Sequence, residues 1–214
     1  NLFSGMDAFS EVRNLENDMT SLNSFNLIST TIKELNLEVG YFTENKSILT
    51  HSRQIYKQSP FSVNIDKSHI QPINSKFYIK LLDDKSFRLT SSEEEVTLYN
   101  YVDNLIVSKY NSVKIDTICK FNETITNKNF KFSVSFNKDL YVPDPKDKSE
   151  LYFVLYHLDL LSKEYLKRLK IEPVSIKSSL INASFQGSNL ELTIEIITCR
   201  HISMTIFPKR IKSL

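Results

Sequence analysis

Residues 15–41 read LENDMTSLNSFNLISTTIKELNLEVGY, and their spacing decides how the fold is interpreted. Apolar residues recur every three or four positions, and Asn, Ser, Thr, Glu and Lys occupy most of the positions between them. This pattern predicts an amphipathic helix of about six turns that ends near Asn36. The alternation of Leu37, Val39 and Tyr41 then predicts a strand directly behind the helix. The apolar face of the predicted helix consists of Leu15, Met19, Leu22, Phe25, Ile28, Ile32 and Leu35.

The middle of the chain is predicted to be rich in strands. Alternating apolar residues predict a strand at 61–65, a hairpin at 77–89, and a second hairpin formed by 118–125 and 130–136. The acidic triplet at 93–95 is interpreted as a solvated turn between such strands.

The last third of the chain returns to alternating strands and helices. It begins after residues 143–148, which read PDPKDK and predict an exposed loop. Ser188 and Glu191 have the spacing of a capping box, which predicts the start of a final helix. The other expected elements are a strand at 151–157, a helix from Asp159, and strands at 171–176 and 180–185.

The expected fold class is α+β, with a mixed sheet and amphipathic helices packed on one of its faces. The length of 214 residues fits one large domain or two small ones. We interpret residues 1–214 as a single domain, with a core formed by 1–73 and 149–207 and a β-rich insert at 74–148.

Composition excludes several classes of function. The 27 basic and 25 acidic residues are scattered, and without a basic stripe we expect no binding of nucleic acid. The three glycines are far apart, so the Gly-rich loops that bind phosphate in kinases and dinucleotide-binding proteins are absent. Any kinase domain is therefore expected outside this chain.

Apolar runs are far shorter than the roughly 20 residues of a membrane helix, and the chain starts without a leader. Any membrane spans are thus expected to flank this piece.

Residue types that carry chemistry do not form a recognisable constellation. Cys199 and His201 are close in sequence, but a zinc site needs a second pair of ligands. Acidic residues in predicted loops look like a solvated surface, and most aromatic residues fall at alternating strand positions that predict a core. We therefore predict no catalytic, cofactor-binding or metal-binding residue. Cys119 and Cys199 are either two buried thiols or, in an oxidising compartment, a disulfide. The four histidines, His51, His69, His157 and His201, are dispersed.

Two separated blocks of the sequence resemble polysaccharide chain-length determinant proteins, the Wzz-like domains. Residues 17–24 (NDMTSLNS) are similar to the family's NE-I-x-x-L-x-S helix, 39–44 (VGYFTE) to its VSYY-x-E strand, and 55–61 (IYKQSPF) to its LYKNSPF segment. Residues 177–189 (KSSLINASFQGSN) resemble its SSII-x-LS-x-x-G-x-N motif in order and spacing. The chain departs from the pattern at Leu190, where the family has proline, and at Thr193, where it has alanine.

The resemblance implies a periplasmic domain of an inner-membrane protein that forms homo-oligomers. It also implies a non-catalytic role in controlling the length, or assisting the export, of a surface or capsular polysaccharide. Its partners would be the polysaccharide and its polymerase or export machinery, with the membrane reached through flanking spans. Two alternatives stay open: a carbohydrate-binding or surface-adhesion module, and an enzyme, which would need a pocket lined by convergent polar groups.

Overall fold

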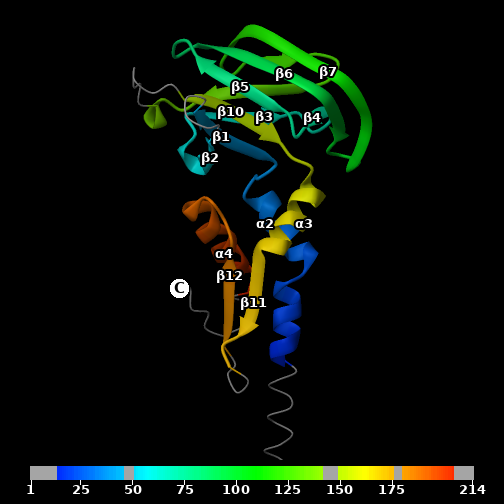
Figure 1. Cartoon of the computed structure of the whole chain (residues 1–214), viewed down its shortest axis with the longest axis vertical. Coiled ribbons are helices and arrows are strands. Elements are labelled where there is room, and N and C mark those ends of the chain that lie inside the picture. Colours follow the sequence, from blue (N-terminus) through cyan, green and yellow to red (C-terminus); the bar gives the residue numbers. More distant parts are fainter. Residues whose placement is uncertain (1–13, 46–50, 142–148, 176–179, 205–214) are drawn as a thin grey trace, which may run out of the picture. The chain divides into compact units, whose positions relative to one another are not determined.

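The computed structural model of the chain describes residues 14–45, 51–141, 149–175 and 180–204 (Figure 1). The described residues form an α+β fold that is rich in strands, so the predicted class is confirmed. They divide into two compact units. One, Glu38–His157, is called the β unit below. The other, the terminal unit, contains the residues before Glu38 and after His157.

The predicted long helix near the start of the chain is in fact two helices. Residues 14–22 form the first, and α2 (Phe25–Glu34) forms the second. Ser24 lies between them in an extended conformation, and its side chain accepts a hydrogen bond from the backbone N–H of Leu27. A serine that caps a new helix in this way competes with continuation of the old one. The predicted end is confirmed, because α2 stops two residues before Asn36, whose φ is 51°.

The rest of the terminal unit follows the predicted order, with shifted boundaries. β11 and β12 pair antiparallel as a two-stranded sheet. The cap of the last helix is Asn189 and not Ser188, because the Asn189 side chain accepts from the backbone N–H of Leu192 at 2.9 Å. The elements are α3 (Leu158–Arg168), β11 (Leu169–Pro173), β12 (Ile181–Phe185) and α4 (Leu190–Met204).

A small apolar cluster joins the two ends of the described chain within the terminal unit. Leu15 and Leu22, from the helix at 14–22, are buried together with Ile181 of β12. Met19, Leu27 and Ile171 are partly buried against them. The first and last segments of the described chain are therefore packed into one structure.

The β unit is built from two antiparallel sheets. The larger has the order β2-β1-β10-β5-β6-β4, with β7 paired along the other edge of β6, and the smaller has the order β3-β9-β8. Every pairing among the described strands is antiparallel, which differs from the mixed sheet expected from the sequence. The strands are β1 (Val39–Asn45), β2 (His51–Gln54), β3 (Phe61–Ile65), β4 (Gln71–Ile73), β5 (Lys76–Leu81), β6 (Ser86–Asn100), β7 (Leu105–Lys120), β8 (Thr124–Thr126), β9 (Lys131–Phe136) and β10 (Glu150–Leu155). Two short 3₁₀ turns, η1 (Tyr56–Gln58) and η2 (Lys138–Leu140), complete it.

These pairings do not follow the predicted division into a core and an insert. β10, expected in the core, lies between β1 and β5, and β5 was assigned to the insert at 74–148. Along the chain, the boundaries of the β unit fall at Glu38 and His157 instead. Hydrogen bonds between strands about 70 to 110 residues apart leave no periodic trace in the sequence, which explains the difference.

An aromatic core fills the space between the two sheets of the β unit. Phe77 and Phe153 of the large sheet stack with 5.0 Å between ring centroids. Phe132 of the small sheet meets Phe153 edge-on at 5.4 Å. All three rings are buried, and such pairs add to the stabilisation that burial itself provides.

Two of the local predictions in this region need correction. Glu93 and Glu94 are not in a turn but inside β6, opposite Val113 and Ser112 of β7, and Glu95 adopts a φ of 61°. The hairpin at 77–89 is confirmed as β5 and β6, whereas in the second hairpin only β8 pairs with β9, since residues 118–120 belong to β7. The loop predicted at 143–148 lies outside the described residues.

Candidate functional site

The histidines and cysteines noted in the sequence do not assemble a site in the described structure. His69 Nδ1 lies 2.8 Å from the carbonyl oxygen of Ile70, and the His157 ring packs on a tyrosine ring. The side chains of His51 and His201 are outside the described part. Across the described residues, no group of three or more His, Cys, Asp or Glu side chains could hold a metal ion.

The two cysteines lie in different units. Cys119 is in the β unit, Cys199 is in the terminal unit, and the structure has no disulfide between them. Burial raises the pKa of the Cys119 thiol, which lowers its reactivity at neutral pH. No helix among the described residues is long and apolar enough to cross a membrane.

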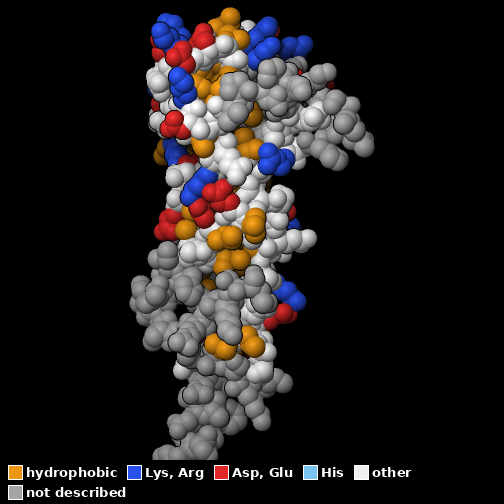
Figure 2. Space-filling model, turned by 90° about the vertical axis from the view of Figure 1, so that its left-hand side faces the viewer, with side chains coloured by type: hydrophobic (Ala, Val, Ile, Leu, Met, Phe, Trp, Pro, Cys, Tyr) orange, Lys and Arg blue, Asp and Glu red, His pale blue; other side chains and the backbone are white. Residues whose placement is uncertain are grey.

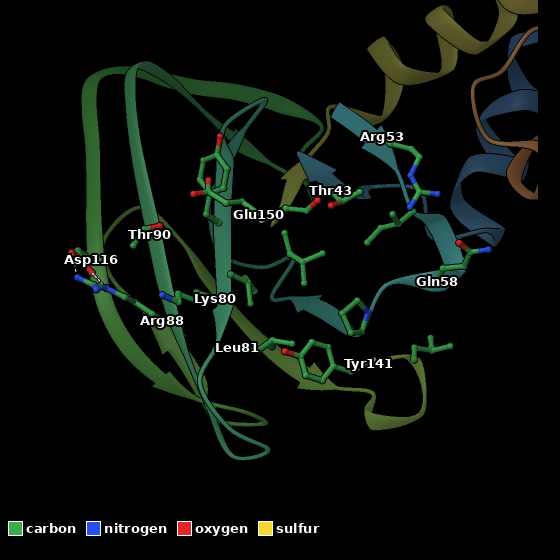
Figure 3. A pocket seen from close by; sticks show the side chains of 17 residues that line it. Thr43, Arg53, Gln58, Lys80, Leu81, Arg88, Thr90, Asp116, Tyr141 and Glu150 are labelled. Atoms are coloured by element: carbon green, nitrogen blue, oxygen red, sulfur yellow. Dashed lines mark hydrogen bonds and ion pairs between the residues drawn. The ribbon is translucent and has the colours of Figure 1, made fainter. Parts of the chain in front are cut away.

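The β unit contains a groove of about 870 Å³ (Figure 3). β10 begins at Glu150, while its neighbours β1 and β5 both continue past that point. Side chains from several strands and from both 3₁₀ turns line the groove. Its volume falls within the range of roughly 300–1,000 Å³ that is typical of ligand sites.

The basic side chains of the groove differ in how they are paired. Arg88 is held by Asp116 through two hydrogen bonds, Nε–Oδ1 at 2.6 Å and Nη2–Oδ2 at 2.7 Å. This pairing lowers the pKa of the Asp116 carboxyl from its usual value and raises that of Arg88. Lys80, directly opposite Arg88 on β5, and Arg53 of β2 have no ion-pair partner among the described residues. Two cations in the groove are therefore available to an anion.

A buried network holds one aromatic ring of the groove in place. The Tyr78 hydroxyl donates to Glu44 Oε2 at 2.9 Å, and Lys76 Nζ lies 3.2 Å from Glu44 Oε1. The pKa of Tyr78 is raised, first by desolvation and then by the hydrogen bond to Glu44. Lys76 Nζ also lies 4.8 Å from the centre of the Tyr152 ring. The hydrogen bond to Glu44 thus fixes the orientation of the Tyr78 ring in the absence of a ligand.

Exposed apolar groups and neutral polar groups complete the lining. Tyr141 packs edge-on against Phe136 at 5.8 Å, yet 37% of its surface remains exposed, so part of its ring is available. Leu81 lies near Tyr141 in Figure 3, and Thr43 and Glu150 lie toward the other end of that view. In the upper part of Figure 2, basic, acidic and hydrophobic side chains are interspersed in the same way over one face of the β unit.

The lining of the groove contains several groups of the kind that bind ligands. Among the described lining residues there is no histidine or cysteine to act as base or nucleophile. Of the two carboxylates, Asp116 is held ionised by Arg88, so it is a poor general acid at neutral pH. Two cations, hydroxyls and tyrosine rings also line the groove, and such groups can bind a ligand through charge, hydrogen bonds and ring contacts.

No pattern in the sequence marks the groove residues as a site. They come from six strands, two short 3₁₀ turns and the loops beside them, so they are scattered along the sequence. Only the pairing of β10 with both β1 and β5 brings them together.

Comparison with known proteins does not extend this description. A scan of the sequence against known protein families matches none of them, and a search of curated proteins finds no relative.

Proposed function

We propose that this chain is a non-catalytic periplasmic domain of an inner-membrane protein. It forms homo-oligomers and regulates the chain length or export of a surface or capsular polysaccharide. The proposal starts from the resemblance to Wzz-like domains, and the structure adds physical arguments in its support.

The observation that carries the proposal is the packing of the two family-like blocks. Residues 17–24 and 177–189 are separated by more than 150 positions, yet Leu22 and Ile181 are buried in the same cluster. The two blocks thus belong to one packed structure, which supports interpreting them as parts of a single domain. Of the intervening family-like segments, 39–44 lies in β1, as its resemblance to a strand implies, and 55–61 leads through η1 into β3.

The glycine of the second block has a specific packing role. A Cβ atom at Gly187 would lie 2.3 Å from Oγ1 of Thr193, far inside van der Waals contact. Thr193 occupies the position where the family has alanine, and its hydroxyl donates to the Asn189 carbonyl at 2.8 Å. This close contact at the turn between β12 and α4 is a feature of this chain, because an alanine at position 193 would have no Oγ1 for the Cβ to meet.

The experiment that tests the proposal compares surface polysaccharide from a strain lacking the gene with that of its parent by gel electrophoresis. We expect an altered length distribution or lost polymer, restored when the gene is returned. An unchanged ladder in a strain that makes polysaccharide would refute the proposal.

The groove favours a second candidate, a carbohydrate-binding or surface-adhesion module. Its exposed tyrosine ring and available cations are suited to a sugar chain. An unchanged ladder together with glycan binding by the purified protein would favour this candidate over the first.

A further inference from the structure

We propose that the groove of the β unit binds an acidic oligosaccharide, whose carboxylates pair with Lys80 and Arg53. The inference rests on the proposed function in taking a sugar chain as the partner. It adds the place on the molecule where that chain binds and the class of sugar that it contains.

Charge is the first argument. Lys80 and Arg53 are both exposed, they lie on different strands, and neither forms an ion pair with another described residue. The charge of Arg88 is already neutralised by Asp116, so Arg88 is not counted among the cations that could pair with a carboxylate of the ligand. Two separate cations match a chain that carries a carboxylate on more than one of its sugar units.

The same groove also disfavours a nucleic acid. Asp116 is already paired with Arg88, and the two remaining cations, Lys80 and Arg53, are too few to neutralise a row of phosphates. For a sugar chain, by contrast, Glu150 is an acceptor for hydroxyl groups. Thr43, Thr90 and Gln58 add neutral donors and acceptors of the kind that hydroxyls need.

The rings of Tyr78 and Tyr141 provide aromatic surfaces on which sugar rings can pack. The faces of sugar rings carry C–H groups that pack on aromatic rings, and both tyrosines line the groove. Tyr78 is fixed through Glu44, and Tyr141 is braced by Phe136. Aromatic groups that are already in position lower the entropic cost of binding.

The test uses the purified 214-residue chain and isothermal titration with three probes. These are tetragalacturonate, neutral maltotetraose and a tetramer of deoxythymidylate. We expect binding of tetragalacturonate that weakens with salt, and much weaker binding of the other two.

The variants Lys80→Gln and Arg53→Gln should each reduce affinity for tetragalacturonate about tenfold, since each removes one charge-assisted contact. Lys114→Gln is the matched control. It removes the same charge from an exposed position on β7 that does not line the groove, so affinity should not change. Circular dichroism of each variant should show an unaltered fold, because all three side chains are exposed.

Three outcomes would overturn the inference. They are no binding of tetragalacturonate beyond that of maltotetraose, equal binding of the deoxythymidylate, or an equal loss in Lys114→Gln. None of these outcomes changes the expected result of the gel comparison of the deletion strain. The inference about the groove can therefore be refuted while the proposed function stands. Conversely, groove binding with an unchanged ladder would refute the proposed function alone.

Discussion

The substitution Gly187→Ala tests the packing between β12 and α4 in a form that can be calculated. The new Cβ would lie 2.3 Å from Thr193 Oγ1 and 3.3 Å from Cε1 of Phe185. The φ of Gly187 is not positive, so the backbone conformation itself accepts alanine. Any loss of stability must therefore come from these two side-chain contacts, of which the contact with Thr193 is the closer.

The cost follows from how little Thr193 can move. Its side chain has one stiff torsion, and rotating Oγ1 away would break its 2.8 Å hydrogen bond to the Asn189 carbonyl. Overpacking of this kind costs about 1–3 kcal/mol, and the reduced freedom of the unfolded chain returns about 0.4–1 kcal/mol. We expect Gly187→Ala to lower the free energy of unfolding by about 1–2 kcal/mol.

A double-mutant cycle separates this contact from other effects. Thr193→Ala removes the atom that the new Cβ meets, so the double variant should lose less stability than the two single losses together predict. We expect a coupling of about 1–2 kcal/mol, within the range seen for residues in direct contact. Urea denaturation of the four proteins, followed by circular dichroism, measures it. A coupling near zero, or a fully stable Gly187→Ala variant, would refute the reasoning.

Three further predictions concern stability. Lys76→Met should lower the free energy of unfolding by about 1–3 kcal/mol in urea denaturation, because the buried Glu44 carboxylate loses its cation, and no change would contradict the network beneath Tyr78. Leu22→Ala should cost about 2–5 kcal/mol, since the side chain is only 3% exposed, and a near-neutral effect would show that the terminal cluster does not form. Lys131 and Ser68 hold the folded pKa of Asp66 below its usual value, so its contribution is complete above about pH 4 and is lost as the pH falls toward the folded pKa. Denaturation between pH 2 and 6 should therefore show a weaker pH dependence in Asp66→Asn, and identical profiles would rule out this linkage.

Periodicity predicted the elements whose burial follows one repeating pattern. The alternation at 61–65 became β3, with Phe61, Val63 and Ile65 buried and the residues between them exposed. The helical spacing of 15–35 was also correct in type, because Leu22, Ile28 and Ile32 are buried. The spacing did not predict the break between the helix at 14–22 and α2. One polar residue, Ser24, caps α2 through a single hydrogen bond and so ends the first helix.

Features that depend on distant pairing could not be predicted. Glu93 and Glu94 have the composition of a turn, but β7 pairs with them and extends the strand. The groove depends on β10 joining β1 to β5, and Lys80 and Arg53 become neighbours of one cavity only through that pairing. Local patterns in a single sequence do not indicate which strands pair with each other.

The length distribution of the surface polysaccharide tests the central claim most directly. It should be quantified in the parent strain, in the deletion strain, and in the deletion strain that carries the gene again. The account predicts a shifted or lost distribution on deletion and a return to the parental one with the gene. Identical distributions in all three strains, with normal amounts of polymer, would contradict it.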